Sequence, residues 1–257
     1  MSMSSRSKEE IPGTDNLWPM TTSVLTHDPP ESDCDEPMTA LRSGEPRDAT
    51  APPSAVQIGP CNIEYDERVL APRPWTLLQS RWAAELSPLV PDGPILELCA
   101  GAGHIGLVAA VECGRRLIQV DVDPVACEFA RSNALRAGIG ERVVVRCESL
   151  NVAVLPAERF PLILADPPYL PTDQVGDWPS DPVRAIDGGP DGLELARRCA
   201  AVVASALDHN GAALIQLAGQ RQVDELDQDL PGELEIREIR EFDPWRAVVL
   251  IQRKSRV

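Results

Sequence analysis

Short apolar runs alternate with amphipathic segments along most of the chain. The apolar runs predict strands at residues 94–99, 116–121, 142–147, 160–165, 212–218, 234–241 and 246–252. Apolar positions at helical spacing predict helices at residues 104–112, 124–137, 191–208 and 220–229. Fully apolar strands that alternate with helices are typical of parallel sheets covered on both faces. The pattern therefore predicts an α/β domain with a doubly wound, mostly parallel seven-stranded sheet, and the short turn at 242–245 predicts an antiparallel edge strand.

A smaller module precedes this domain. Ala55–Ile58 and Asn62–Tyr65 read as short strands around the turn Gly59-Pro60, and Thr76 offers an N-cap for a helix that reaches about Leu86. We therefore predict a β-hairpin and helix at residues 55–92, followed by the main domain at residues 93–257.

Residues 1–54 have a different composition. They are rich in Ser, Thr and Pro, carry four Lys or Arg against ten Asp or Glu, and show no periodic apolar face. Such a segment buries too little apolar surface to offset the entropy lost on ordering. The sequence therefore predicts a disordered acidic tail.

Composition narrows the classes of partner. A net charge of −16 disfavours binding of nucleic acid by counterion release. No run approaches the roughly eighteen apolar residues of a membrane span, and the N-terminus lacks a signal-peptide pattern. The seven cysteines form no Cys-x-x-Cys pair, and neither they nor the three histidines form a zinc-like cluster. We predict a cytoplasmic protein with reduced cysteines, no membrane association and no metal.

A glycine-rich loop follows the first strand of the main domain. Gly101–Gly106 matches the dinucleotide fingerprint, with Asp121 at the end of the next strand, which by itself indicates NAD. Glu97 disfavours that interpretation, because a carboxylate at the loop repels pyrophosphate and suits a cationic amino-acid group. S-adenosylmethionine has such a group and a ribose diol for Asp121. The alternative is a tight turn with no ligand.

A second motif, Asp166-Pro167-Pro168-Tyr169, ends the fourth apolar strand. Asp166 and the carbonyl of Pro167 can accept both N–H groups of a nitrogen that is to be methylated. The prolines stiffen the loop, and Tyr169 offers a stacking face. The alternative is a proline-stiffened turn without chemistry. The long Val175–Pro190 stretch predicts a lid over this site, and His104 is given no catalytic role.

These motifs resemble the class I S-adenosylmethionine-dependent methyltransferases, and among them the HemK-like family that methylates a glutamine amide of release factors. The resemblance covers residues 55–257 and rests on 70–76, 166–169 and 185–194. It implies the following cofactor-binding residues: Glu97, Cys99, Gly101, Gly103, Asp121, Glu148, Ser149 and Asp166. It further implies catalytic roles for Asp166, Pro167 and Tyr169, and substrate contacts for Arg73 and Pro168.

The chain departs from the family at three of these positions. Cys99 replaces the first glycine of the loop, Ser149 stands where an acid contacts adenine, and Asp166 replaces the family's Asn. An ionised Asp only accepts hydrogen bonds, whereas Asn also donates to an amide carbonyl. We also expect the predicted disordered tail to take the place of the helical N-terminal domain of the release-factor enzymes.

The expected activity is N-methylation of an amide or amine of a protein side chain, with a release factor as one such protein, or of a small-molecule nitrogen. Two alternatives stay open. Asp166 also favours methylation of an amino group of rRNA or DNA, and the altered loop is compatible with a non-catalytic cofactor-binding module.

Overall fold

The computed structural model describes residues 52–255. The acidic tail predicted for residues 1–54 therefore lies almost entirely outside the described residues. The first strand, β1 (Ser54–Ile58), pairs with β2 (Cys61–Tyr65) in the predicted antiparallel hairpin. No helix among residues 52–255 is long and apolar enough to cross a membrane.

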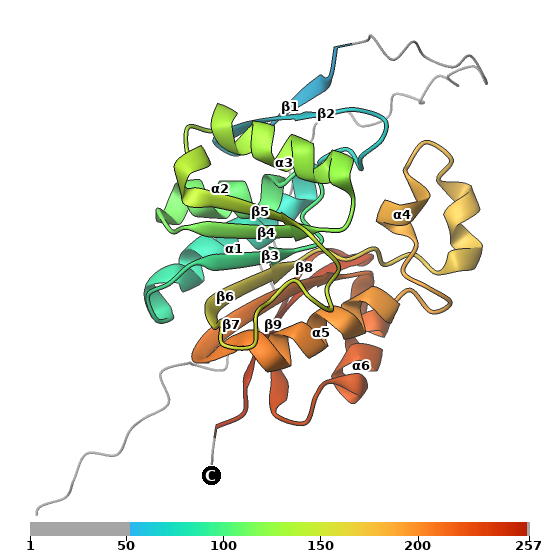
Figure 1. Cartoon of the computed structure of the whole chain (residues 1–257). Helices are drawn as coiled ribbons and strands as arrows, with labels where there is room; N and C mark the ends of the chain where they lie inside the picture. Colours follow the sequence, from blue (N-terminus) through green and yellow to red (C-terminus); the bar gives the residue numbers. More distant parts are fainter. Residues whose placement is uncertain (1–51, 256–257) are drawn as a thin grey trace, which may run out of the picture.

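Seven strands form the central sheet in the order β5-β4-β3-β6-β7-β9-β8 (Figure 1). Their bounds are β3 Ile95–Leu98, β4 Leu117–Asp121, β5 Val143–Cys147, β6 Phe160–Ala165, β7 Leu207–Leu217, β8 Leu234–Asp243 and β9 Arg246–Arg253. The first five strands pair in parallel, and β9 runs antiparallel to both β7 and β8. This order confirms the mostly parallel sheet with an antiparallel edge. At this edge β9 lies between β7 and β8, and β8 is the outermost strand.

Helices cover both faces of the sheet (Figure 1). On one face lie α1 (Leu77–Leu86), α2 (His104–Cys113) and α3 (Pro124–Arg136), and on the other lie α5 (Glu194–Ala206) and α6 (Gly219–Asp229). Successive residues of a strand enter opposite cores, because side chains alternate across a sheet. In β6, for example, Leu162 and Leu164 pack under α1 and α2, whereas Ile163 packs under α5.

The hairpin and α1 share a core with the sheet instead of forming a separate unit. Ile63 of β2 and Trp82 of α1 are fully buried in the same cluster as Ile105 of α2. Asn133 of α3 joins the two parts, because its amide donates to the carbonyls of Glu64 and Ala102 and its oxygen accepts from the N–H of Glu64.

The region after β6 differs from the expectation. The predicted helix at 191–208 begins only at Glu194, because Asp191 accepts from the N–H of Leu193 in a turn and Gly192 is left-handed. The predicted loop before it contains the 3₁₀ helix η4 (Thr172–Asp177) and the short helix α4 (Val183–Ile186). Further 3₁₀ turns are η1 Pro74–Thr76, η2 Ser87–Leu89 and η3 Gly140–Arg142.

Candidate active site

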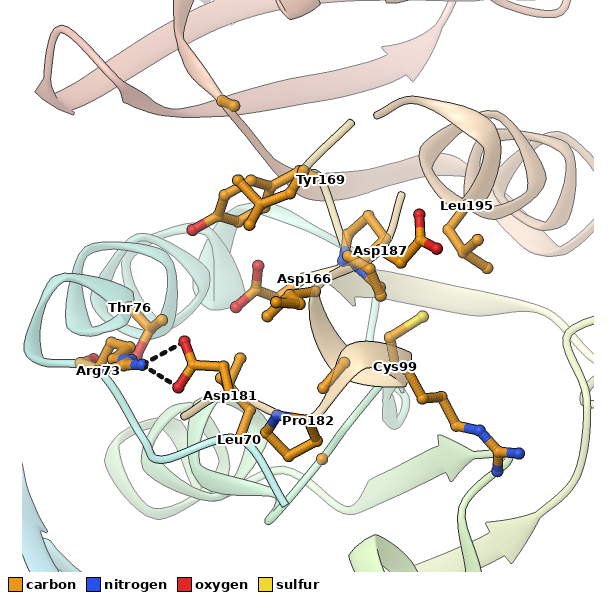
Figure 2. A pocket seen from close by; sticks show the side chains of 18 of the residues that line it. Leu70, Arg73, Thr76, Cys99, Asp166, Tyr169, Asp181, Pro182, Asp187 and Leu195 are labelled. Atoms are coloured by element: carbon orange, nitrogen blue, oxygen red, sulfur yellow. Dashed lines mark hydrogen bonds and ion pairs between the residues drawn. The ribbon is translucent and has the colours of Figure 1, made fainter. Parts of the chain in front are cut away.

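A cavity of about 1430 Å³ opens at the carboxyl ends of β3, β4 and β6 (Figure 2). The chain moves outward from β3 through β4 to β5 and then returns to the other side of β3 as β6. Ligands bind at such reversals in open α/β sheets, because the loops on the two sides diverge there. The glycine loop and the segment at 166–169 both line this cavity.

The loop after β3 needs left-handed backbone at three positions. Cys99, Gly101 and Gly103 have φ angles of 56°, 55° and 84°, and α2 begins directly afterwards at His104. Cys99 is the one non-glycine residue with positive φ among residues 52–255. Its side chain packs against the core, and both Cys99 and Gly101 line the cavity. Gly103 faces Gln119 behind the loop instead, where an added Cβ would meet the Gln119 amide.

Glu97 lies behind the loop, not at its mouth. Its carboxylate accepts from the N–H of Gly106 at 2.9 Å and from the side-chain amide of Gln119 at 2.6 Å, and it is absent from the cavity wall. Burial raises the pKa of Glu97 to about 7. The expectation that Glu97 meets the cofactor directly is thus corrected: this carboxylate is taken up in holding the loop and the start of α2.

Asp121 ends β4 and reaches the cavity from beside the loop. It accepts from the N–H of Gly101 at 2.8 Å and from the N–H of Asp123 at 2.9 Å. Its carboxylate has no cationic partner within residues 52–255, and burial raises its pKa. Glu148 and Ser149, which follow β5, line the cavity too, and the N–H of Glu148 bonds to the Asp121 carbonyl at 2.9 Å.

Asp166 directly follows β6, with its side chain on the cavity wall near Tyr169 (Figure 2). Within residues 52–255 its carboxylate has no hydrogen-bond donor or cation as a partner, and burial raises its pKa to about 7. Burial also raises the pKa of Tyr169 to about 12. Pro167 and Pro168 complete this wall, so the structure brings all four residues of the motif to the cavity.

The segment at 185–194 supports this wall from behind. The N–H of Leu170 donates to the carbonyl of Ile186 at 3.0 Å, and the N–H of Gly188 donates to the carbonyl of Leu170 at 2.8 Å. An added Cβ at Gly188 would meet the carbonyl of Pro168 at 2.6 Å. An added Cβ at Gly192 would likewise meet the carbonyl of Tyr169. Only glycines permit this approach, which gives a physical reason for the Gly-Gly-Pro-Asp-Gly pattern.

Arg73 joins the N-terminal module to the segment that covers the cavity, 171–187. One guanidinium nitrogen donates to both carboxylate oxygens of Asp181 at 2.8 Å (Figure 2). The hydroxyl of Thr76 donates to the Arg73 carbonyl at 2.6 Å instead of capping α1, which corrects the expected N-cap. His104 contacts this hydroxyl at 3.0 Å, and burial lowers the pKa of His104 to about 4.

Sequence reasoning gave no site role to three residues of the cavity wall, namely Trp75, Asp181 and Arg246. The guanidinium of Arg246 lies 3.7 Å from the ring centroid of Trp75, and that of Arg73 lies 5.8 Å from the same ring. Arg246 follows the turn between β8 and β9, which was interpreted only as a connection. The Asp-Pro-Trp-Arg sequence of this turn was the available signal.

Similar proteins were found among curated sequences. A release factor glutamine methyltransferase of Deinococcus radiodurans is 35% identical over 168 residues, which are 63% of this chain and 59% of that protein. A ribosomal protein uL3 glutamine methyltransferase of Bradyrhizobium diazoefficiens is 32% identical over 181 residues, which are 65% of this chain and 56% of that protein. No protein-family model matches the chain. The chain thus spans somewhat more than half the length of these relatives.

Solved structures share the fold at lower identity. The ribosomal protein L11 methylase of Lactobacillus delbrueckii subsp. bulgaricus aligns with a TM-score of 0.55 at 17% identity, covering 74% of this chain and 84% of that chain. The hMettl16 catalytic domain, crystallised with an RNA hairpin, aligns with a TM-score of 0.61 at 13% identity, covering 76% of each chain. The fold is that of the class I methyltransferases, and the resemblance to HemK-like glutamine methyltransferases is confirmed.

Proposed function

We propose that this protein transfers a methyl group from S-adenosylmethionine to the side-chain amide nitrogen of a glutamine in a protein. One observation carries the proposal. Asp121 at the end of β4 and the 166–169 motif at the end of β6 open onto one cavity, in a chain similar to glutamine methyltransferases.

The lining of the cavity fits S-adenosylmethionine better than a dinucleotide. The N–H of Gly101, which a pyrophosphate would need, is already bonded to Asp121. The remaining lone pairs of the Asp121 carboxylate and the acidic side chain of Glu148 suit hydroxyl and amino donors instead. In this proposal Asp121 holds the ribose hydroxyls, Glu148 or Ser149 holds the adenine, and the Cys99–Gly101 backbone and Asp166 hold the methionine end.

When bound, S-adenosylmethionine supplies an electrophilic methyl group on its sulfonium. The chain's own contribution is to position the acceptor nitrogen and to accept hydrogen bonds from its two N–H groups. The Asp166 carboxylate and the Pro167 carbonyl accept the two N–H groups, which turns the nitrogen lone pair out of conjugation with the amide carbonyl. With the methyl group supplied in line, the nitrogen would gain its new N–C bond while Asp166 and Pro167 hold its two N–H groups, and the proton that it then loses would pass to water.

Thermal unfolding with each cofactor tests the binding half of the proposal. S-adenosylmethionine should raise the melting temperature and NAD should not, because ligands that bind only the folded state stabilise it. A rise with NAD alone would contradict the cofactor assignment.

Transfer of a labelled methyl group tests the reaction. We expect label in a release factor or in ribosomal protein uL3, the proteins for which the relatives are named. Asp166→Ala should abolish transfer and leave most of the cofactor-induced stabilisation in place. Cofactor binding without transfer to any fraction of a cell extract would favour a non-catalytic binding module.

A second candidate acceptor is an amino group of a nucleic acid. The observation that favours it is Asp166 itself, because a carboxylate suits an amino group that has no carbonyl beside it. Label recovered in the RNA or DNA fraction, and not in protein, would establish this candidate instead.

A further inference from the structure

A primary carboxamide presents two kinds of hydrogen-bonding group to an enzyme. Its NH₂ group donates and its carbonyl oxygen accepts, so complete recognition needs both an acceptor and a donor from the protein. The ionised Asp166 provides acceptors alone. If the acceptor is a glutamine, a second residue at this end of the cavity must supply the donor, or the carbonyl is left unpaired at a cost in binding.

Arg246 is placed to supply it. The residue begins β9, lines the cavity and lies 3.7 Å above the Trp75 ring. An ion pair with Asp243 fixes one of its terminal nitrogens. Arg246, Asp166 and Tyr169 line the same cavity, and the charges of Asp166, Arg246 and Arg73 all act on the phenol of Tyr169. A guanidinium carries five N–H donors and no acceptor, which complements a carboxylate.

The other arginine near this end is already engaged. Arg73 approaches the same Trp75 ring at 5.8 Å, but its guanidinium is bound to both oxygens of Asp181. Of the two arginines on the Trp75 ring, Arg246 keeps more N–H donors for a ligand, because it gives one hydrogen bond, to Asp243, whereas Arg73 gives two to Asp181.

The hairpin formed by β8 and β9 contains a second arginine with nearly identical surroundings. Arg240 of β8 lies 4.2 Å from the Trp82 ring and pairs with Glu85 and Glu238, but it is not part of the cavity wall. Arg240 and Arg246 thus both pack on a tryptophan ring, but only Arg246 of these two also lines the cavity.

We propose that Arg246 donates a hydrogen bond to the carbonyl oxygen of the acceptor carboxamide while Asp166 accepts its N–H, so that two residues read the group that a single Asn reads in the related enzymes. Arg246 is then a specificity-determining residue for amide acceptors. The inference rests on the proposed function.

The test uses the full chain with S-adenosylmethionine and whichever of the two acceptor proteins the wild type methylates. Arg246→Met should lower kcat/KM roughly 10- to 100-fold, as expected for loss of a charged hydrogen bond, without weakening cofactor binding. Arg246→Lys keeps the charge but not the planar guanidinium, so its kcat/KM should lie between those of Arg246→Met and the wild type. Arg240→Met is the matched control, and its kcat/KM should equal that of the wild type.

The decisive variant is the double substitution Asp166→Asn with Arg246→Met. Asn provides a donor of its own, so it should restore at least about tenfold of the activity that Arg246→Met alone loses. A merely structural role of Arg246 predicts no such rescue.

Two results would overturn the inference and leave the proposed function standing: an Arg246→Met enzyme as active as the wild type, or a loss that Asp166→Asn does not relieve. A wild-type enzyme that binds the cofactor but methylates neither protein would instead refute the glutamine acceptor itself.

Discussion

Two carboxylates near the glycine loop, the buried Glu97 and the partly buried Asp166, have opposite surroundings at the scale of single residues. Glu97 has both oxygens occupied by donors of the protein, whereas Asp166 has none within residues 52–255. Glu97 is absent from the cavity wall and holds the backbone of the loop, whereas Asp166 lines the cavity with no donor of the described chain on its oxygens. This contrast supports the acceptor-binding role proposed for Asp166.

The pKa of Asp166 predicts how the reaction depends on pH. Because N–H groups are best accepted by the ionised form, kcat/KM for methyl transfer should rise with pH and level off above about 7. The profile of kcat should have a lower midpoint, because a bound cationic cofactor favours the carboxylate. Steady-state rates between pH 5.5 and 9 measure both. A kcat/KM that is constant over this range would contradict the assignment.

Cys99 predicts a local cost in stability. Its φ of 56° is unfavourable for a residue with a Cβ by roughly 1–2 kcal/mol. Cys99→Gly should therefore be more stable than Cys99→Ala by about 1 kcal/mol, since both variants lack the thiol and differ in the Cβ. Urea unfolding of the two variants measures the difference, and equal stability would show that the loop relaxes around the side chain.

At the scale of elements, the cavity is enclosed by pieces that are distant in the chain. η1 comes from the N-terminal module, η4 and α4 follow β6, and the β8–β9 turn comes near the C-terminus. The Arg73–Asp181 pair joins the first of these to the second. Both side chains are largely shielded, with 33% and 13% exposed, so the pair is screened less than an ordinary surface ion pair.

Breaking this pair should loosen the covering segment. We expect Asp181→Asn to raise amide hydrogen exchange across residues 171–187 by about tenfold, which corresponds to about 1.4 kcal/mol, and to leave exchange in β3 and β6 unchanged. Asp173→Asn, an exposed acid of the same segment, is the control. An unchanged exchange rate in Asp181→Asn would mean that backbone bonds such as Gly188 to Leu170 hold the segment on their own.

At the scale of the whole molecule, the acidic chain places several carboxyl groups around one cavity. Burial raises the pKa of both Glu97 and Asp166 to about 7, above their unfolded values of about 4. Between pH 4 and 7 the folded state therefore binds more protons than the unfolded state. As far as these two groups are concerned, the free energy of unfolding is highest at the acidic end of this window and decreases as the pH rises.

The melting temperature should accordingly decrease from pH 5 to pH 8. Each of the two groups costs about 1.4 kcal/mol per pH unit between pH 5 and 7, and about 1 kcal/mol corresponds to about 2–4 °C in a domain of this size, so we expect a fall of roughly 10–20 °C from these two groups. Asp166→Asn should reduce the fall, because one of the two groups no longer titrates. Calorimetry across this range tests the sign, and a melting temperature that increases toward pH 8 would contradict the burial of these two carboxyl groups.

The sequence by itself determined the layered sheet and most of the cavity wall. Apolar runs such as 160–165 have few structural solutions besides a strand buried on both faces, and residues at the ends of parallel strands must meet at one edge. Asp121 and Asp166 could therefore be placed without coordinates. The direction of a side chain at such an edge is not fixed by the pattern. Glu97 turned toward Gly106 and Gln119, away from the cavity, because two donors of the folded chain were there to meet its charge.

Only the tertiary structure decided which residues complete the site. Arg73, Asp181 and Arg246 lie more than sixty residues apart in the sequence, and each one alone looks like a solvated charge. Folding brings them to one cavity through the crossing of η1, the covering segment and the β8–β9 turn. Local periodicity contains no information on such long-range contacts, because they depend on how whole elements pack.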